Sequence, residues 1–129
     1  MPDMTRIARK PTDSELAILR VLWTHGPSTV RHVAEALGRE AAYTTVLKLL
    51  QIMTEKGLVL RDESERTHIY RAAYTEDQTQ RQLVTDLLDR AFDGSAAKLV
   101  LQALSSNTAS PQELEEIRKL LNKQRGVSR

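Results

Sequence analysis

AYTTVLKLLQIMTEKG, residues 42–57, predicts an amphipathic helix that ends at its final glycine. Apolar side chains recur on one side at helical spacing and are expected to face a core: Val46, Leu49, Leu50 and Met53. The opposite side is polar and carries no carboxylate before Glu55; its residues are Tyr43, Thr44, Thr45, Lys48 and Gln51. Solvated helix faces usually mix Lys with Glu, so a face without acids is expected to lie against an acidic partner.

Two short helices are predicted before this one. Thr12 and Glu15 form a capping box at the start of the first helix, and the sequence HGP at residues 25–27 ends it. Ser28 is expected to cap the second helix, which ends at Gly38. Each helix is short and the connections between them are tight.

A β-hairpin is predicted after the third helix. LVLR at 58–61 and THIYRAAY at 67–74 are its two arms, and the polar sequence DESER forms its tip. In the second arm Ile69 alternates with His68 and Tyr70, as expected for a half-buried strand with Ile69 on the core side. Three short helices followed by such a hairpin are typical of a winged helix-turn-helix, whose third helix enters a DNA major groove.

Residues 75–129 predict three further helices, which begin at TEDQ (75–78), Ser95 and Ser110. The expected fold class is therefore mainly α with a small β-hairpin, with a winged-helix DNA-binding domain at 1–74 and a helical domain at 75–129. The apolar faces of the last three helices either cover the first domain or pair with a second chain. We expect pairing, because three such helices form a thin core alone.

The polar face of the 43–56 helix has chemistry that suits DNA. Thr hydroxyls can donate to phosphates or reach base edges, and Lys48 can meet guanine or phosphate. Amides at a helix N-terminus also favour phosphate. The alternative is that Thr44 and Thr45 only cap the helix and that Lys48 is solvated. We predict DNA contact for this face, with Tyr43 at its N-terminal end and Gln51 one turn beyond Lys48.

Basic side chains on neighbouring segments are candidates for contacts with the DNA backbone: Arg31, His32, Arg39, Arg66 and His68, with Arg6, Arg9 and Lys10 as a basic N-terminal arm. The hairpin tip also carries Asp62, Glu63 and Glu65, which would repel phosphate, so a solvated turn is the alternative for the tip. The formal net charge is only +2, and overall charge therefore says little about nucleic acid.

Several function classes are not expected. The chain has no cysteine, which excludes disulfides and thiolate metal sites. His25, His32 and His68 form no pair at ligand spacing with a carboxylate, so we predict no metal site and no cofactor. Catalytic motifs are missing, which predicts that the chain is not an enzyme. No signal sequence and no apolar run of about 18 residues occur, which predicts a cytoplasmic protein without membrane insertion.

PTDSELAILRVLW, GPSTVRHV, YTTV with the following EKGLV, and KLVLQAL near residue 100 resemble the BlaI/MecI/CopY family of bacterial repressors, over roughly residues 12–121. The resemblance implies a homodimer whose winged helices each bind half of an inverted repeat, often with TACA/TGTA-like half-sites. It places Tyr43, Thr44, Thr45 and Lys48 on the recognition helix. With the apolar stripes it predicts these dimerisation residues: Leu83, Leu87, Leu88, Leu99, Val100, Leu104, Leu114, Ile117 and Leu121.

The resemblance also implies two ways of releasing such repressors. In antibiotic-responsive members a membrane-bound sensor protease triggers cleavage between an Asn and a Phe after an LVL run. The matching bond joins Gln102 and Ala103, which both differ from that pattern and form the candidate site of regulatory cleavage. Copper-responsive members bind metal through C-terminal cysteines, and this chain has none.

The function predicted from the sequence is a transcriptional repressor that binds an inverted-repeat operator as a homodimer, related to repressors of antibiotic-resistance genes. A winged-helix protein-interaction module is one alternative, which the acidic hairpin tip would suit. A small-molecule-responsive regulator is another, although no part of the sequence marks a ligand pocket.

Overall fold

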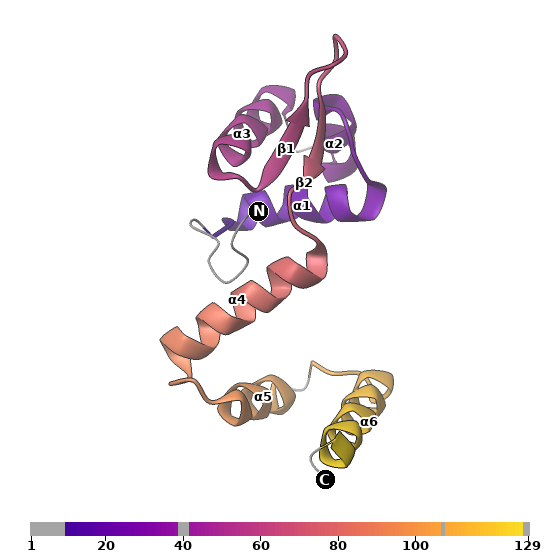
Figure 1. Cartoon of the computed structure of the whole chain (residues 1–129). Helices are drawn as coiled ribbons and strands as arrows, with labels where there is room; N and C mark the ends of the chain where they lie inside the picture. The colour runs from indigo at the N-terminus through magenta and orange to yellow at the C-terminus, as the bar shows by residue number, and fades with distance from the viewer. Residues whose placement is uncertain (1–9, 39–41, 107, 128–129) are drawn as a thin grey trace. The chain divides into compact units, whose positions relative to one another are not determined.

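The computed structural model describes residues 10–38, 42–106 and 108–127 (Figure 1). These ranges form six helices and one two-stranded sheet: α1 (Asp13–His25), α2 (Val30–Leu37), α3 (Tyr43–Lys56), β1 (Val59–Asp62), β2 (Ile69–Ala72), α4 (Glu76–Ala91), α5 (Ala96–Ser105) and α6 (Pro111–Val127). The predicted class, mainly α with a small hairpin, is confirmed. The chain divides into two compact units, Met1–Thr85 and Asp86–Arg129, and the division falls within α4. The domain boundary expected after residue 74 remains a prediction.

Local capping chemistry sets the ends of the helices. At α1 the Thr12 backbone N–H donates to Glu15 Oε1 at 2.9 Å, and the Glu15 N–H donates to Thr12 Oγ1 at 3.2 Å. At the C-terminus of α3, Gly57 adopts the left-handed conformation with φ 81°, which glycine enters without the steric penalty of a Cβ. The predicted capping box and the predicted glycine stop are confirmed.

The predicted cap of α2 is wrong by one residue. Thr29 is the N-cap, and its hydroxyl accepts a hydrogen bond from the His32 N–H at 3.1 Å. Ser28 has another role, because its backbone pairs with Tyr70 through N–H···O contacts of 2.9 and 2.8 Å. The turn between α1 and α2 is thereby attached to β2, which lies between this turn and β1.

One hydrophobic core holds the first unit together. It combines buried side chains from α1, α2, α3 and the hairpin: Ile18, Leu19, Val21, Leu22, Val30, Val33, Ala34, Val46, Leu50, Met53, Leu58, Val59 and Tyr70. The predicted stripe of α3 is confirmed, with Leu49 only partly buried at its edge. The stripe fixes the orientation of α3, so the polar face of this helix points away from the core.

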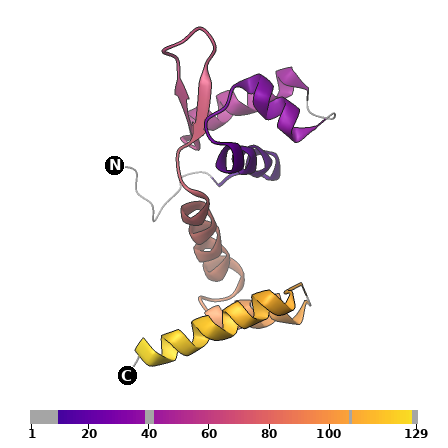
Figure 2. The ribbon, with the colours of Figure 1, turned by 90° about the vertical axis from the view of Figure 1, so that its right-hand side faces the viewer.

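The hairpin reaches beyond the three helices at its tip (Figures 1 and 2). Its antiparallel register pairs Val59 with Ala72 and Arg61 with Tyr70. The predicted phase of the second arm is wrong, because Tyr70 is 1% exposed whereas Ile69 is only partly buried. Tyr70 shares the inner face with Val59 and Ala72, and its large ring fills space that Ile69, on the outer face, cannot reach.

A buried ion pair joins the start of α1 to the end of α3. Lys56 Nζ lies 2.9 Å from both carboxylate oxygens of Glu15, whose side chain is 2% exposed. Burial acts to raise the pKa of Glu15, but the Thr12 N–H and the Lys56 ammonium outweigh it, so this pKa lies below its usual value. The ion pair therefore helps to hold the recognition-helix candidate against α1.

The second half of the chain is helical, with the predicted start signals in place. Thr75 with Gln78 and Ser110 with Glu113 form reciprocal side chain–backbone pairs, and Ser95 caps α5. None of residues 86–106 and 108–126 is buried. No helix in the described part of the chain is both long enough and apolar enough to cross a membrane.

Candidate nucleic-acid interface

The outward face of α3 is polar and free of acids over its first three turns. Successive residues of an α-helix are about 100° apart, so Thr44, Lys48 and Gln51 share the stripe opposite the buried one. All three are exposed, and Tyr43 is 50% exposed at the helix start. Thr45 is also exposed but lies on one flank of the stripe. The first carboxylate on the stripe is Glu55, which marks its C-terminal end.

No residue that the structure describes provides a side-chain cap at the start of α3. Ala42 is the N-cap and makes no side-chain hydrogen bond to the helix. The alternative that Thr44 and Thr45 serve only as caps is therefore wrong, because they lie inside the first turn. The first-turn amides of α3 have no intrahelical acceptor and can meet an anion from outside.

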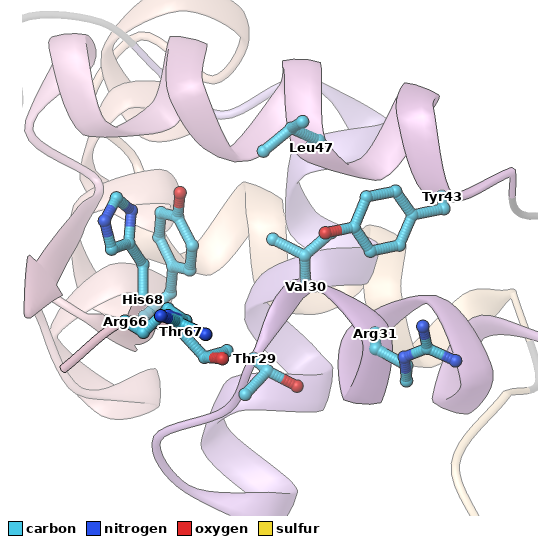
Figure 3. Close-up of a pocket in the computed structure, with 9 residues that line it drawn as sticks. Thr29, Val30, Arg31, Tyr43, Leu47, Arg66, Thr67 and His68 are labelled. Carbon is cyan, nitrogen blue, oxygen red and sulfur yellow. The ribbon is translucent and has the colours of Figure 1, made fainter. Parts of the chain in front are cut away.

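A hollow of about 540 Å³ lies between α2, α3 and the hairpin (Figure 3). The start of α2 contributes Thr29, Val30 and Arg31; α3 contributes Tyr43 and Leu47; the hairpin contributes Arg66, Thr67, His68 and Tyr70. The hollow thus brings together four of the predicted DNA contacts, namely Arg31, Tyr43, Arg66 and His68. Thr44, Thr45, Lys48 and Gln51 do not line it and instead face outward from α3.

The charge of the hollow is favourable for an anion. Arg31 and Arg66 supply two cations, His68 adds an imidazole, and none of the nine lining residues is acidic. Neither α2 nor α3 has an acid in its first turn, whereas α1, α4 and α6 do. Acids at a helix start stabilise it through the helix dipole. Their absence at these two starts leaves both open to an external negative charge.

The tip of the hairpin is electrostatically different from its base. Arg61 Nε donates to Glu63 Oε2 at 2.6 Å, and this hydrogen bond raises the pKa of Arg61. The Ser64 N–H donates to Asp62 Oδ1 at 2.9 Å and lowers the pKa of Asp62, which keeps this carboxylate charged. Glu63 therefore compensates Arg61, and the hollow receives its hairpin cations from Arg66, the last residue of the tip, and from His68 after it.

Some predicted contacts cannot be placed, and others were missed. Arg39, Arg6 and Arg9 lie outside the described residues, and Lys10 is exposed just before α1. Thr29 and Thr67 line the hollow but were not predicted. Thr67 lies between the predicted contacts Arg66 and His68 in the sequence. This neighbourhood was the only feature of the sequence that could have indicated that Thr67 lines the hollow.

Comparison with known proteins identifies the family. The family model described as penicillinase repressor matches residues 11–123. The chain belongs to this family. The transcriptional regulator BlaI of Mycobacterium tuberculosis is 36% identical over 104 residues, which cover 78% of this chain and 72% of the relative. The penicillinase repressor of Bacillus licheniformis is 22% identical over 112 residues, 85% of this chain and 88% of the relative.

A solved structure agrees on the fold of this penicillinase-repressor family member. An hsRosR-S4 complex superimposes with a TM-score of 0.53 at 20% identity, over 98% of this chain and 100% of that chain. Family membership assigns the chain to the DNA-binding transcriptional repressors of the BlaI/MecI type. Family and fold are both those of transcriptional regulators.

Proposed function

We propose that this repressor binds an inverted-repeat operator as a homodimer and inserts residues 43–52 of each subunit into one major groove. The observation that carries the proposal is the continuity of two surfaces. The acid-free stripe of α3 adjoins the cationic hollow through Tyr43, which is exposed on α3 and also lines the hollow. A helix that reads bases beside a site that holds the backbone is what sequence-specific recognition requires.

Base contacts are assigned to the stripe of α3. Lys48 suits guanine, Gln51 suits adenine, and a Thr methyl can pack on the thymine methyl. Thr44 lies on the same stripe, one turn before Lys48, and Thr45 contacts the same groove from its flank. The set ends before Glu55, whose carboxylate would approach the phosphates of the opposite groove wall.

Backbone contacts are assigned to the residues of the hollow. Arg31, Arg66 and His68 surround it, and the starts of α2 and α3 add backbone amides. A DNA phosphate in this position would meet cations from α2 and from the segment that connects β1 to β2 together. The acidic tip, with Asp62 and Glu65, is assigned to solvent.

The second unit is proposed to form the dimer. The predicted dimerisation residues are partly buried or exposed in one chain: Leu83, Leu88, Leu99, Leu104 and Ile117 are partly buried, and Leu87, Val100, Leu114 and Leu121 are exposed. The side chain of Leu121, for example, is 57% exposed. Exposed leucines on helices with no buried residue in the described ranges 86–106 and 108–126 favour association with a second copy.

The proposed release follows the family precedent. Gln102 and Ala103 are exposed and lie inside α5, next to Leu101, which is 66% exposed. A protease needs an extended substrate, so cleavage between Gln102 and Ala103 requires local unfolding of α5. A membrane sensor protease or its pathway is the proposed partner, and the cytoplasm, where the operator DNA lies, is the proposed place of action.

Fluorescence anisotropy with labelled duplexes tests the proposal. One duplex carries a TACA…TGTA inverted repeat from upstream of the gene, and the other a scrambled sequence. We expect two chains per specific duplex and an affinity that falls steeply with salt. Arg31→Ala should weaken both duplexes alike. Arg118→Ala, which removes an exposed arginine from α6, is the matched control and should change neither. Equal, weak binding of both duplexes would refute specific recognition of this repeat and favour a protein partner for the winged helix.

A further inference from the structure

Two histidines that are separated in sequence meet beside the turn between α1 and α2. His25 is in the last turn of α1, and His32 is in the first turn of α2. Their ring centroids are 5.2 Å apart, and the ring planes are inclined by 71°. Both side chains are exposed. Their seven-residue spacing is no ligand spacing, so the sequence predicted no metal site, but the turn brings the rings together.

The separation of the rings matches a shared metal ion. With Zn–N bonds of about 2.0–2.1 Å and tetrahedral angles, the centres of two imidazoles on one zinc ion lie about 5 Å apart. The χ2 torsion of histidine has a broad energy minimum, and exposed rings can turn at little cost. One nitrogen of each ring can therefore be aimed at a common point without moving either helix.

We propose that His25 and His32 together bind one divalent transition-metal ion of the type that prefers imidazole, such as Zn²⁺ or Ni²⁺. Hard cations such as Mg²⁺ and Ca²⁺ are excluded by this donor set, because they prefer oxygen ligands. No group of three or more His, Cys, Asp or Glu among the described residues could hold a metal ion. Water molecules complete the coordination of the ion. The positive charge of Arg31, next to His32 in the sequence, repels the metal cation. The site is therefore one of modest affinity.

The bound ion would tie α1 to α2. Both ligands are in place only in the folded chain, so metal binding stabilises the folded state over the unfolded one. Arg31, which follows Val30 in the first turn of α2, lines the DNA-facing hollow. The proposed metal site thus lies one residue from a proposed phosphate contact, but its existence does not depend on the proposed function.

Calorimetric titration of the tag-free full-length protein with zinc chloride tests this site. We expect one ion per chain with saturation below millimolar concentrations. His25→Gln and His32→Gln should each weaken zinc binding by at least about 10–100-fold. This is the loss of metal affinity that follows when only a hydrogen-bond partner of a ligand is removed, and here a ligand itself is lost. His68→Gln, which removes the third histidine of the chain, is the matched control and should leave binding unchanged.

Trp23 provides a second measurement that also checks folding. It is the only tryptophan of the chain and lies two residues before His25, so its fluorescence follows urea unfolding of the first unit. Zinc should raise the urea midpoint of the wild type and of His68→Gln, and magnesium should not. Full zinc affinity in either His25→Gln or His32→Gln would overturn the proposal, as would an absence of saturable binding in the wild type. An equal loss in His68→Gln would also overturn it.

Discussion

Removing the Lys56 ammonium should destabilise the first unit far more than removing a surface charge. Lys56 Nζ lies 2.9 Å from both oxygens of Glu15, and the two side chains are 16% and 2% exposed. Lys56→Met keeps most of the apolar stem but leaves a buried carboxylate with the capping contacts of Thr12 alone. The cost is therefore mainly that of an uncompensated buried charge.

The size of the loss lies between two known limits. Breaking a fully buried pair costs about 3–5 kcal/mol, whereas an exposed pair contributes about 0–1 kcal/mol. Because Lys56 retains some contact with water, we expect about 2–3 kcal/mol at neutral pH for Lys56→Met. Glu15→Gln keeps an acceptor for the Thr12 N–H and should cost less. Glu15→Ala also loses the capping box, which adds about 0.5–2 kcal/mol.

The loss should depend on pH in one direction. The pKa of Glu15 is lowered in the folded chain, so the ion pair contributes its full stability above the ordinary carboxyl value of 4.5. This contribution disappears as the pH falls through the lowered folded pKa, because the carboxyl group is then protonated. The difference between wild type and Lys56→Met should be constant near neutrality and shrink at acidic pH, as the pH falls from the pKa of Glu15 in the variant to its lowered pKa in the wild type.

Urea unfolding followed by Trp23 fluorescence measures the effect. Trp23 Nε1 donates to the Tyr74 carbonyl at 3.0 Å, so its signal reports the first unit. Protein concentration must be fixed, because dimer formation shifts apparent stability. Arg81→Met is the matched control: it breaks the ion pair with Asp77, whose partners are 79% and 76% exposed, and should cost at most about 0.5 kcal/mol. Equal losses for Lys56→Met and Arg81→Met, or a loss that persists unchanged at low pH, would refute the reasoning.

Four further substitutions test the interface and the dimer. Thr44→Ala should weaken the inverted-repeat duplex by about 1–2 kcal/mol and leave the scrambled duplex unchanged, with a smaller loss for Thr45→Ala on the flank; anisotropy giving the reverse order would contradict the orientation of α3. Arg66→Ala should weaken both duplexes alike and reduce the slope of log affinity against log salt by about one phosphate contact. An unchanged slope would remove Arg66 from the backbone contacts. Leu121→Asp should shift sedimentation towards monomer while the Trp23 unfolding transition persists; an intact dimer would place the interface elsewhere.

The start of α1, the end of α3 and the core stripe of α3 could be predicted from the sequence because their causes are local. Thr12 and Glu15 are three residues apart, and the apolar stripe repeats within one helix. The phase of β2 could not be predicted, since it depends on Tyr70 pairing with Ser28, 42 positions earlier by their numbers. The alternation of Ile69 with its neighbours is compatible with either residue on the inner face of the hairpin. In the structure the larger ring of Tyr70 occupies the inner face.

The candidate DNA interface was predicted only in part for a similar reason. The stripe of α3 follows from helical periodicity, so Thr44, Lys48 and Gln51 could be named from the sequence. The hollow depends on three segments that meet only after folding, which is why Thr29 and Thr67 were missed. The contact of His25 with His32 needed the turn geometry as well.

The small number of base-reading side chains explains why the exposed leucines of the second unit matter. In the proposed complex one subunit offers Lys48 and Gln51 as its long base-reading side chains, and a good bidentate contact discriminates by about 1–3 kcal/mol. A specific site must be about 4–10 kcal/mol better than random DNA. Two readers supply only the lower part of that range, whereas two subunits on one inverted repeat double the number of readers. The phosphate contacts of the hollow cannot close the gap, because they are the same on every sequence. In the proposed complex selectivity therefore depends on the dimer, and a signal that separated the α4–α6 helices of two chains should release the operator without touching α3.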